Sequence, residues 1–273
     1  MIEDILVSGE TIACSTDHIA ARRSGSVGYL IFNRPERRNA VSLEMWLAIP
    51  EVMAVFNADP QIRSIVLAGA GREAFIAGAD ISEFENERKD AKAALAYEER
   101  NTAAYRAIAE SPKSVIAMID GFCIGGGVAI AAACDMRIAA IGSTFAVPAA
   151  RLGLAYPPYA MGLLLRAVTP SRAKFLIHTA RRLTAEEARD FGLVDKVVPR
   201  EELGEYVAGL TSAIAENAPL TIAAANATID ALFAEGDVDE NARRAIMACF
   251  DSEDYSEGRR AFIEKRKPVF QGK

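Results

Sequence analysis

The chain has 273 residues, of which 51% are hydrophobic and 25% are charged, and its formal net charge is −6. This apolar content is enough for one large domain, or for a core with an appendage, and it excludes a disordered chain. An acidic chain gives no reason to expect a nucleic-acid or anionic-membrane partner.

Several features bear on where the protein works. Residues 1–10 include acidic side chains but no Lys or Arg, so they lack the positive region of a secretory signal. The longest uncharged stretches, residues 121–134 and 138–150, are too short to span a bilayer. The cysteines have no CxxC spacing, which favours free buried thiols in a reducing compartment. We therefore expect a cytoplasmic protein with no membrane partner.

Short β-prone runs recur along the first 200 residues. Strands are predicted at residues 27–32, 62–67, 114–119, 137–140 and 194–198. The first run ends in the turn-like segment 33–36. The other expected elements in this part of the chain are helices.

The helical signals are more varied. Ser42 can cap a helix, and Pro50 indicates either a kink in that helix or the first turn of a second one. The Ala-rich segment 125–134 is predicted to be a buried helix, and residues 171–182 to be another. A capping box at residues 184–187 opens the next helix.

The character of the chain changes beyond Pro199. Helical spacing with few strand signals covers residues 201–216, 219–233, 240–250 and 253–265. We therefore predict an α/β core at residues 1–200 and a C-terminal helical region at residues 201–273.

Two glycine-rich segments suggest ligand contacts. Residues 69–74 match the GxGxxA spacing of a dinucleotide fold, but the required periodic helix does not follow, so we interpret them as a strand and a tight turn. The triplet Gly125, Gly126 and Gly127 precedes the Ala-rich helix. Glycines there allow a ligand to approach the free N–H groups of the helix terminus, where negative charge is favoured. Close packing of the helix against a sheet would select the same residues, and both readings stay open.

Histidines and basic residues offer little chemistry by themselves. His18 and His178 are the only histidines, and neither has a companion at metal-ligand spacing, so we expect no metal site and no Ser-His-Asp triad. Arg37, Arg38 and residues 265–267 form basic clusters, which are usually solvated surface.

Together these segments resemble the enoyl-CoA hydratase/isomerase (crotonase) family from about residue 26 to residue 270. In chain order the markers are NRPERRNA at 33–40, AGADI at 77–81, DGFCIGGG at 120–127, AACD at 132–135, RLGL at 151–154, TAEEA at 184–188, GLV at 192–194 and FIEKRK at 262–267. Each marker is weak alone, whereas their order and spacing are specific.

The resemblance implies a fold, a substrate class and an assembly. The fold would be a crotonase-type α/β spiral of ββα units with a C-terminal helical trimerisation region. The substrate would be an acyl-CoA thioester, which itself carries the coenzyme A, so no separate cofactor is expected. The assembly would be a homotrimer or a dimer of trimers.

The resemblance also assigns residues to the site. The backbone N–H groups of Ala79 and Gly126 would form an oxyanion hole for the thioester carbonyl. Residues implied to lie along the coenzyme A are Arg37, Arg38, Ala40, Ala77, Ala79, Asp80, Ile81, Gly126, Phe262 and Lys265. The last two often reach the ligand from a neighbouring subunit, and the place of Asp80 suits a structural or CoA-loop role better than proton transfer.

The sequence departs from the hydratase pattern at both catalytic glutamates. The positions of those glutamates are occupied by Ala129 and Ala149. Each positioned acid or base is worth about 10²–10⁴-fold in rate, and Ala has no proton to exchange. Single-glutamate isomerases place their base at the second of these positions, so Ala149 weakens that reading as well.

Tyr156 is the remaining polar candidate. It lies eleven residues after Phe145, where methylmalonyl-CoA decarboxylase-like members carry a Tyr near the acyl group, although such enzymes have a His in place of Ala79. A wall of the acyl pocket is the alternative role for Tyr156. Three readings follow: a hydratase/isomerase-like enzyme with Tyr156 or water in place of the glutamates, a decarboxylase-like lyase, and a CoA-thioester-binding protein without turnover.

Overall fold

The protein is built around two β-sheets in a computed structural model that describes the backbone of residues 1–273 and every side chain except those of 234 and 235. The larger sheet has seven strands in the order β1 (Glu10–Ile12), β2 (Ile19–Ser24), β3 (Val27–Phe32), β4 (Ser64–Gly69), β6 (Ser114–Ile119), β8 (Met136–Ala140) and β11 (Lys196–Val198). The smaller sheet has the order β10 (Leu183–Thr184), β9 (Thr144–Ala146), β7 (Phe122–Ile124) and β5 (Ala74–Ile76).

The two sheets are filled by repeating units. Each of the consecutive strand pairs β4 and β5, β6 and β7, and β8 and β9 gives its first strand to the larger sheet and its second to the smaller one. A helix follows each pair: α4 (Ala91–Ala109), α5 (Gly126–Ala133) and α6 (Pro158–Ala167). From β3 to β11 the larger sheet is parallel. The predicted α/β spiral of ββα units is therefore confirmed.

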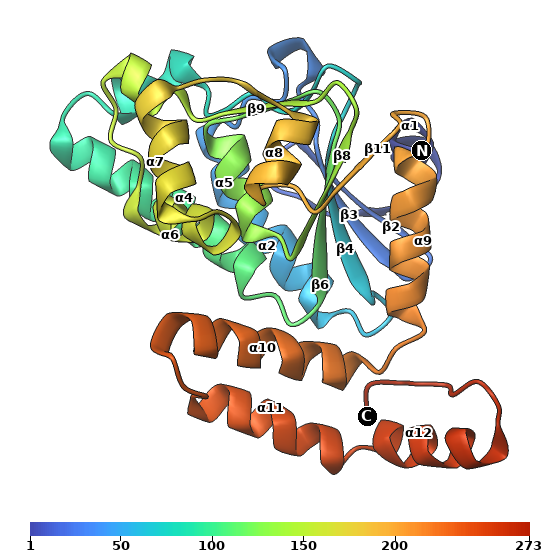
Figure 1. Ribbon diagram of the computed structural model, residues 1–273. Coiled ribbons are helices and arrows are strands. Elements are labelled where there is room, and N and C mark those ends of the chain that lie inside the picture. The colour runs from blue at the N-terminus through green and yellow to red at the C-terminus, as the bar shows by residue number, and fades with distance from the viewer.

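The central strands are buried on both faces. All residues of β3 and β6 are buried, as expected for parallel strands covered by helices on both sides. Alternate side chains enter two separate cores: Leu30 and Phe32 pack under α2 (Leu43–Ala58), whereas Tyr29 and Ile31 pack under α1 (Ile2–Ser8) and α9 (Leu203–Ala215). Figure 1 shows α9 on the face of the sheet opposite to α2, α5 and α8 (Ala185–Phe191).

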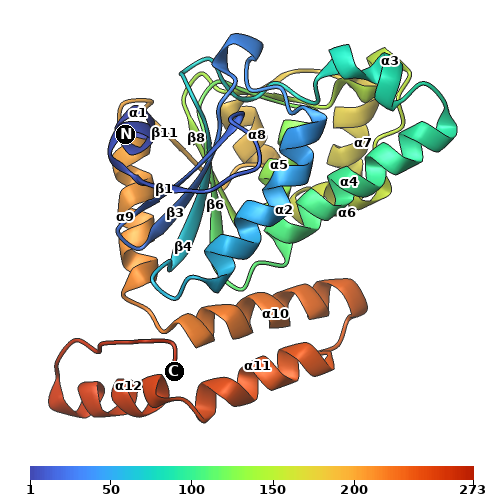
Figure 2. The same cartoon turned by 180° about the vertical axis from the view of Figure 1, so that it is seen from behind.

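The C-terminal helices divide into two groups. Leu203 and Val207 of α9 are buried against the larger sheet. The next helices, α10 (Pro219–Glu235), α11 (Glu240–Phe250) and α12 (Glu253–Glu264), extend away from the core (Figures 1 and 2). The C-terminal segment is nevertheless tied back, because the Arg63 guanidinium donates to the Phe270 carbonyl oxygen over 2.6 Å.

Several local predictions are confirmed and others need correction. Strands β3 and β6 have the predicted bounds, and the capping box at Thr184 and Glu187 is formed in both directions. Helix α2 runs as one element through Pro50, so no second helix begins there. Cys123 and Cys134 are buried free thiols, and burial raises the pKa of both. Helix α4 and the smaller sheet were not predicted.

Helix α7 (Pro170–Thr179) is shorter than the predicted segment 171–182 at its C-terminal end. Ala180 takes a left-handed conformation, with φ of 48°, and ends the helix there. The remaining short elements are helix α3 (Phe84–Glu87) and the turns η1 (Pro35–Arg37), η2 (Ile81–Glu83) and η3 (Pro148–Leu152). Residues of α3, η2 and η3 line the cavity described below.

Gly127 and Gly209 both lie in helices, but only Gly127 is closely packed, and this difference should affect the free energy of unfolding. A Cβ atom at Gly127 would lie 2.5 Å from the Ile76 carbonyl oxygen, whereas one at Gly209 would meet nothing within 4 Å. Gly127→Ala should therefore lower the free energy of unfolding by about 1–3 kcal/mol through overpacking. Gly209→Ala should raise it by up to about 1 kcal/mol, because Ala favours helix. Urea unfolding of both variants tests this, and equal effects would contradict the packing role of Gly127.

Candidate functional site

A cavity of about 110 Å³ lies at the N-terminal end of α5. It is formed by the segment that follows β5, by the glycine turn before α5 and by residues 147–157 after β9, with Trp46 of α2 and Tyr105 of α4 also in its wall. Most of the lining is apolar. Apart from backbone groups, the polar side chains that line it are Arg88, Asn101, Tyr105 and Tyr156, together with the indole of Trp46.

The three glycines before α5 have three different physical requirements. Gly125 has φ of 55° and ψ of −111°, a conformation open to glycine but strained for other residues. Gly126 faces the cavity, and a Cβ there would lie 3.4 Å from the Trp46 ring. Gly127 packs against the backbone of Ile76. The two sequence interpretations of this triplet, ligand approach and close packing, therefore apply to different glycines.

The Ala79 N–H group lies on the side of its segment that faces away from Val41, and its nitrogen is close to Gly126. Val41 donates to the Gly78 carbonyl over 2.8 Å, and Asp80 donates to the Val41 carbonyl over 2.9 Å. Successive N–H groups of an extended segment point to opposite sides, so the Ala79 N–H points away from Val41. A Cβ at Gly126 would lie only 3.7 Å from the Ala79 nitrogen.

Both of these N–H groups are free. Neither the Ala79 nor the Gly126 nitrogen donates to any acceptor among the residues that the structure describes. Gly126 is the first residue of α5, where an N–H has no partner within the helix, and the helix dipole adds partial positive charge. The cavity wall therefore contains two neighbouring backbone N–H groups without acceptors, and a carbonyl oxygen or oxyanion can accept hydrogen bonds from such groups.

A polar network holds the Ala79 segment in place. The Arg34 guanidinium donates to the Asp80 carboxylate over 2.9 Å and to the Ala40 carbonyl over 3.0 Å. The buried Asn39 amide accepts from the Arg34 N–H over 3.0 Å and donates to the Ala74 carbonyl over 2.7 Å. These contacts join the loop before α2 to both ends of the segment that carries Ala79.

Asp80 is ionised within this network. Burial acts to raise the pKa of its carboxyl, but hydrogen bonds from Ser82 and Arg34 outweigh burial and hold that pKa below its usual range. Both carboxylate oxygens are occupied by these partners. Asp80 therefore has the structural role that its position in the sequence suggested.

Tyrosines form one wall and are kept protonated. The Trp46 indole donates to the Tyr97 hydroxyl over 2.9 Å, and the edge of Tyr105 packs on Trp46 with ring centroids 5.3 Å apart. Burial raises the pKa of Tyr97 to about 12, and it raises the pKa values of Tyr105 and Tyr156 well above their usual range. The Tyr156 hydroxyl donates to the Gly125 carbonyl over 3.2 Å, so this side chain braces the glycine turn.

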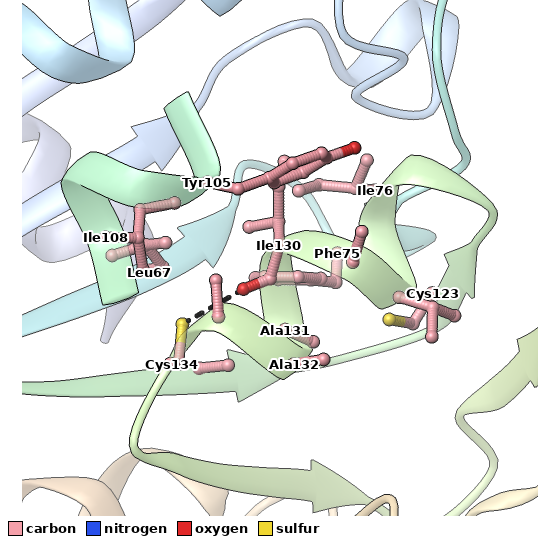
Figure 3. Close-up of a cluster of buried hydrophobic side chains, with 14 of the residues drawn as sticks. Leu67, Phe75, Ile76, Tyr105, Ile108, Cys123, Ile130, Ala131, Ala132 and Cys134 are labelled. Atoms are coloured by element: carbon pink, nitrogen blue, oxygen red, sulfur yellow. Dashed lines mark hydrogen bonds between the residues drawn. The ribbon is translucent and has the colours of Figure 1, made fainter. Parts of the chain in front are cut away.

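The floor beneath the glycine turn is a packed apolar cluster. Figure 3 shows Ile130 of α5 among side chains from α4, including Ile108 and Tyr105, and from β5, including Phe75. The Cys134 thiol donates to the Ile130 carbonyl over 3.3 Å at the end of the same helix. This packing fixes α5, and therefore the position of its first N–H group.

No carboxylate lines the cavity in the described part of the chain. Ala149 lies in its wall, whereas Ala129 is fully buried in the core. Within that same part of the chain, no three His, Cys, Asp or Glu side chains gather as a metal ion would require, and no helix combines the length and apolarity needed to cross a membrane.

The predicted site residues fall into two groups. Those that line the cavity are Ala77, Ala79, Ile81, Gly126 and Tyr156. Those that do not line it are Arg37, Arg38, Ala40, Asp80, Phe262 and Lys265.

The second group is dispersed. Arg38 pairs with Glu73 over 2.6 Å on the surface, and Arg37 is exposed beside it. Phe262 is 86% exposed on α12, and Lys265 caps that helix, far from α5 in the same chain (Figure 1).

Four residues of the site were not assigned a role from the sequence. Arg34 and Asn39 lie inside the marker at 33–40, and an Asn at a positive φ, here 55°, is a recognisable signal only once the backbone is known. Arg88 and Asn101 belong to a segment where no helix was predicted, so nothing in the sequence connected them to the cavity.

Comparison with known proteins gives consistent matches along the chain. A family model described as Enoyl-CoA hydratase/isomerase matches residues 22–273. The crotonyl-CoA hydratase of Syntrophomonas wolfei is 35% identical over 266 residues, covering 94% of this chain and 99% of that protein. The carnitinyl-CoA dehydratase of Salmonella typhi is 32% identical over 259 residues, covering 92% and 97%. A crystal structure of an enoyl-CoA hydratase/carnithine racemase from Magnetospirillum magneticum matches with a TM-score of 0.91 at 35% identity, covering 95% and 97%.

Asp80→Asn should reveal how strongly the ion pair holds the site. The paired side chains of Arg34 and Asp80 are 12% and 11% exposed, and removing one partner of a buried pair costs about 3–5 kcal/mol. The pKa of Asp80 is lower in the folded protein than in the unfolded chain. The ionised carboxylate therefore adds its full contribution to the free energy of unfolding above about pH 4, and this contribution is lost as the pH falls through the lowered pKa. Urea unfolding at pH 7 and at about pH 3 should show a difference from wild type that shrinks in acid. An equal difference at both pH values would contradict this role.

Proposed function

The chain belongs to the enoyl-CoA hydratase/isomerase family, and we propose that it is an enzyme that binds an acyl-CoA thioester and stabilises its enolate. The observation that carries this proposal is the pair of free N–H groups of Ala79 and Gly126 in one largely apolar cavity. A pure binding protein has no need of two donors aimed at a developing oxyanion.

The reaction would proceed through charge on the thioester oxygen. When a C2 substituent or proton leaves, its electron pair passes through C2 to the carbonyl oxygen, and the two N–H groups bind that oxygen more tightly as it becomes negative. Preorganised donors in a site from which water is excluded need little reorganisation, and loss of one such donor costs about 10²–10³-fold in kcat. The dipole of α5 supports the same charge.

Proton transfer is the step in which this site differs from a two-glutamate hydratase. No carboxylate lines the cavity, and Ala149 occupies the wall where a base would act. With each lost acid or base worth about 10²–10⁴-fold, hydration of a 2-enoyl-CoA would be slow unless ordered water carries the proton. Tyr156 stays protonated because burial raises its pKa, so it can orient a substrate group but cannot act as a base at neutral pH.

The absence of a base favours a second candidate, a methylmalonyl-CoA decarboxylase-like lyase. Loss of CO₂ breaks the bond between C2 and the carboxylate, leaves its electron pair in the enolate and requires no base. A proton from water then completes the product at C2. The apolar wall and the two free donors suit that step, and Tyr156 would orient the acyl group by turning its hydroxyl from the Gly125 carbonyl to the substrate.

The coenzyme A moiety would extend out of the cavity. We propose that Ala77 and Ile81 border its path, and that Arg37, Arg38 and Ala40 lie near its phosphates. Phe262 and Lys265 are far from the cavity of their own chain, so they could reach the ligand only from a neighbouring subunit. A cytoplasmic location also stays a prediction.

A turnover screen with crotonyl-CoA and methylmalonyl-CoA tests the proposal. Gly126→Pro removes one N–H donor at a helix position that tolerates proline, so it should lower whichever activity exists by about 10²–10³-fold. Gly209→Ala, on α9, is the matched control and should leave turnover unchanged.

The outcomes separate the candidates. Hydration that depends on Gly126 supports the hydratase-like reaction, and CO₂ release that depends on Gly126 supports the decarboxylase-like one. Binding of CoA thioesters without turnover on either substrate would favour a different acyl group or a binding protein. Turnover that survives Gly126→Pro would overturn the role of the two N–H groups.

The exposed apolar face of α10–α12 supports a homotrimer or a dimer of trimers. Phe250 is 60% exposed, Phe262 is 86% exposed and Ile263 is 79% exposed, and a groove of about 680 Å³ lies between α10, α12 and the C-terminal segment. Contiguous apolar surface of this kind usually marks an interface. Sedimentation equilibrium should therefore give three or six chains, and Phe262→Glu should shift the protein towards smaller species. A monomeric wild type would contradict the proposal.

A further inference from the structure

Arg88 is a cation in the cavity wall without an anionic partner. Its guanidinium carbon lies 4.4 Å from the ring centroid of Phe84 and 4.2 Å from that of Tyr97, two rings that meet edge to face at 73°, so it contacts both aromatic side chains. Within the described residues, its side chain makes no salt bridge, and its Nε atom is buried with no hydrogen-bond acceptor. Stacking fixes the orientation of the guanidinium but leaves its hydrogen-bonding edge unused.

Three carboxylates near Arg88 in the sequence are engaged with other groups. Asp80 pairs with Arg34 over 2.9 Å, and Glu87 pairs with Arg100 over 2.9 Å. Glu83 accepts from the backbone N–H at the start of α2 over 2.8 Å. Arg88 therefore has no place in a structural ion pair with this segment, although acidic side chains surround it in the sequence.

Asn101 is a second unpaired polar group in the same wall. It is 2% exposed, it lines the cavity, and its Oδ1 atom has no hydrogen-bond partner. The unpaired Oδ1 is an acceptor, so Asn101 meets an anion only when its amide rotates and turns the NH₂ group into the cavity. Tyr97, which stacks on Arg88, lies one helical turn before Asn101 on the same face of α4.

We propose that the acyl group of the substrate ends in a carboxylate, which Arg88 and Asn101 bind while Ala79 and Gly126 hold the thioester oxygen. The Arg88 guanidinium donates to the carboxylate. Asn101 turns its terminal amide so that the NH₂ group faces the same oxygen, a rotation that the broad χ2 torsion of Asn allows. The cavity is small, about 110 Å³, which suits a short dicarboxylic acyl chain.

This inference rests on the proposed function, because it assumes that a CoA thioester occupies the cavity. A CoA phosphate is the other anion that could meet Arg88. The acyl carboxylate is favoured because Arg88 lines the cavity that contains both free N–H groups, whereas Arg37 and Arg38, proposed to lie near the phosphates, do not line it.

Binding of three probes tests the inference by isothermal titration calorimetry. Succinyl-CoA carries the carboxylate, butyryl-CoA has the same chain length with a methyl group in its place, and free coenzyme A lacks the acyl group. Wild type should bind succinyl-CoA at least about tenfold more tightly than butyryl-CoA, as one hydrogen-bonded charge predicts. Arg88→Gln should reduce this ratio to about one without changing the affinity for free coenzyme A.

Variants separate recognition from folding and from phosphate binding. Arg88→Lys keeps the charge and should retain part of the preference, which a purely structural role of the stacked guanidinium would not produce. Arg37→Gln is the matched control, because it removes an arginine that is proposed to lie near the phosphates of coenzyme A. This variant should lower the affinity for all three probes by the same factor.

Two results would overturn the inference and are distinguishable from each other. The proposed carboxylate subsite is wrong if wild type binds succinyl-CoA and butyryl-CoA with equal affinity. It is also wrong if Arg88→Gln lowers the affinity for free coenzyme A as much as the affinity for succinyl-CoA. In both cases the proposed function stands. If no probe binds wild type, the proposed function fails as well.

Discussion

The arrangement of this protein depends on keeping the peptide N–H groups of Ala79 and Gly126 without protein acceptors in the wall of one largely apolar cavity. Both residues are partly exposed, so the surrounding structure has to hold these donors at the cavity surface and away from other backbone acceptors. The bridge between Val41 and the Ala79 segment uses the N–H groups on one side of that segment and leaves the other side open. The start of α5 supplies the second donor, and the packing of Gly127 on Ile76 fixes where it lies.

The charged and titratable side chains near the cavity also leave the two N–H groups free for a ligand. The Arg34 and Asp80 pair sits behind the segment rather than in the cavity, so it positions Ala79 without competing for the ligand. Two tyrosines, Tyr105 and Tyr156, line the cavity with hydroxyl groups whose pKa values are raised by burial, and neither can act as a base at neutral pH. The cavity therefore offers two free backbone donors and no carboxylate to move protons, which suits the proposed reactions that generate an enolate without a strong base.

Much of the fold could be predicted from the sequence, because the signals for its strands and helices are local or periodic. Strands β3 and β6 are unbroken apolar runs of the kind that covered parallel strands require, and their bounds were predicted. The strands of the smaller sheet have two or three residues each, which is too few to show the repeating apolar pattern of a strand. Helix α4 was missed although Asp90 caps it and its buried residues recur at helical spacing, so a signal for it was present in the sequence.

For the site, the sequence alone determined which residue types are present: the glycine triplet, Ala at the two positions where the resemblance leads one to expect glutamates, and the markers that pointed to the family. Residue identity and order along the chain need no coordinates. Only the tertiary structure decided which glycine faces the cavity and which packs against Ile76, and that Arg88 and Asn101 both line the cavity. The reason is physical: whether a donor is free, or a cation unpaired, depends on every group that the fold brings near it, and those groups come from strands and helices far apart in the sequence.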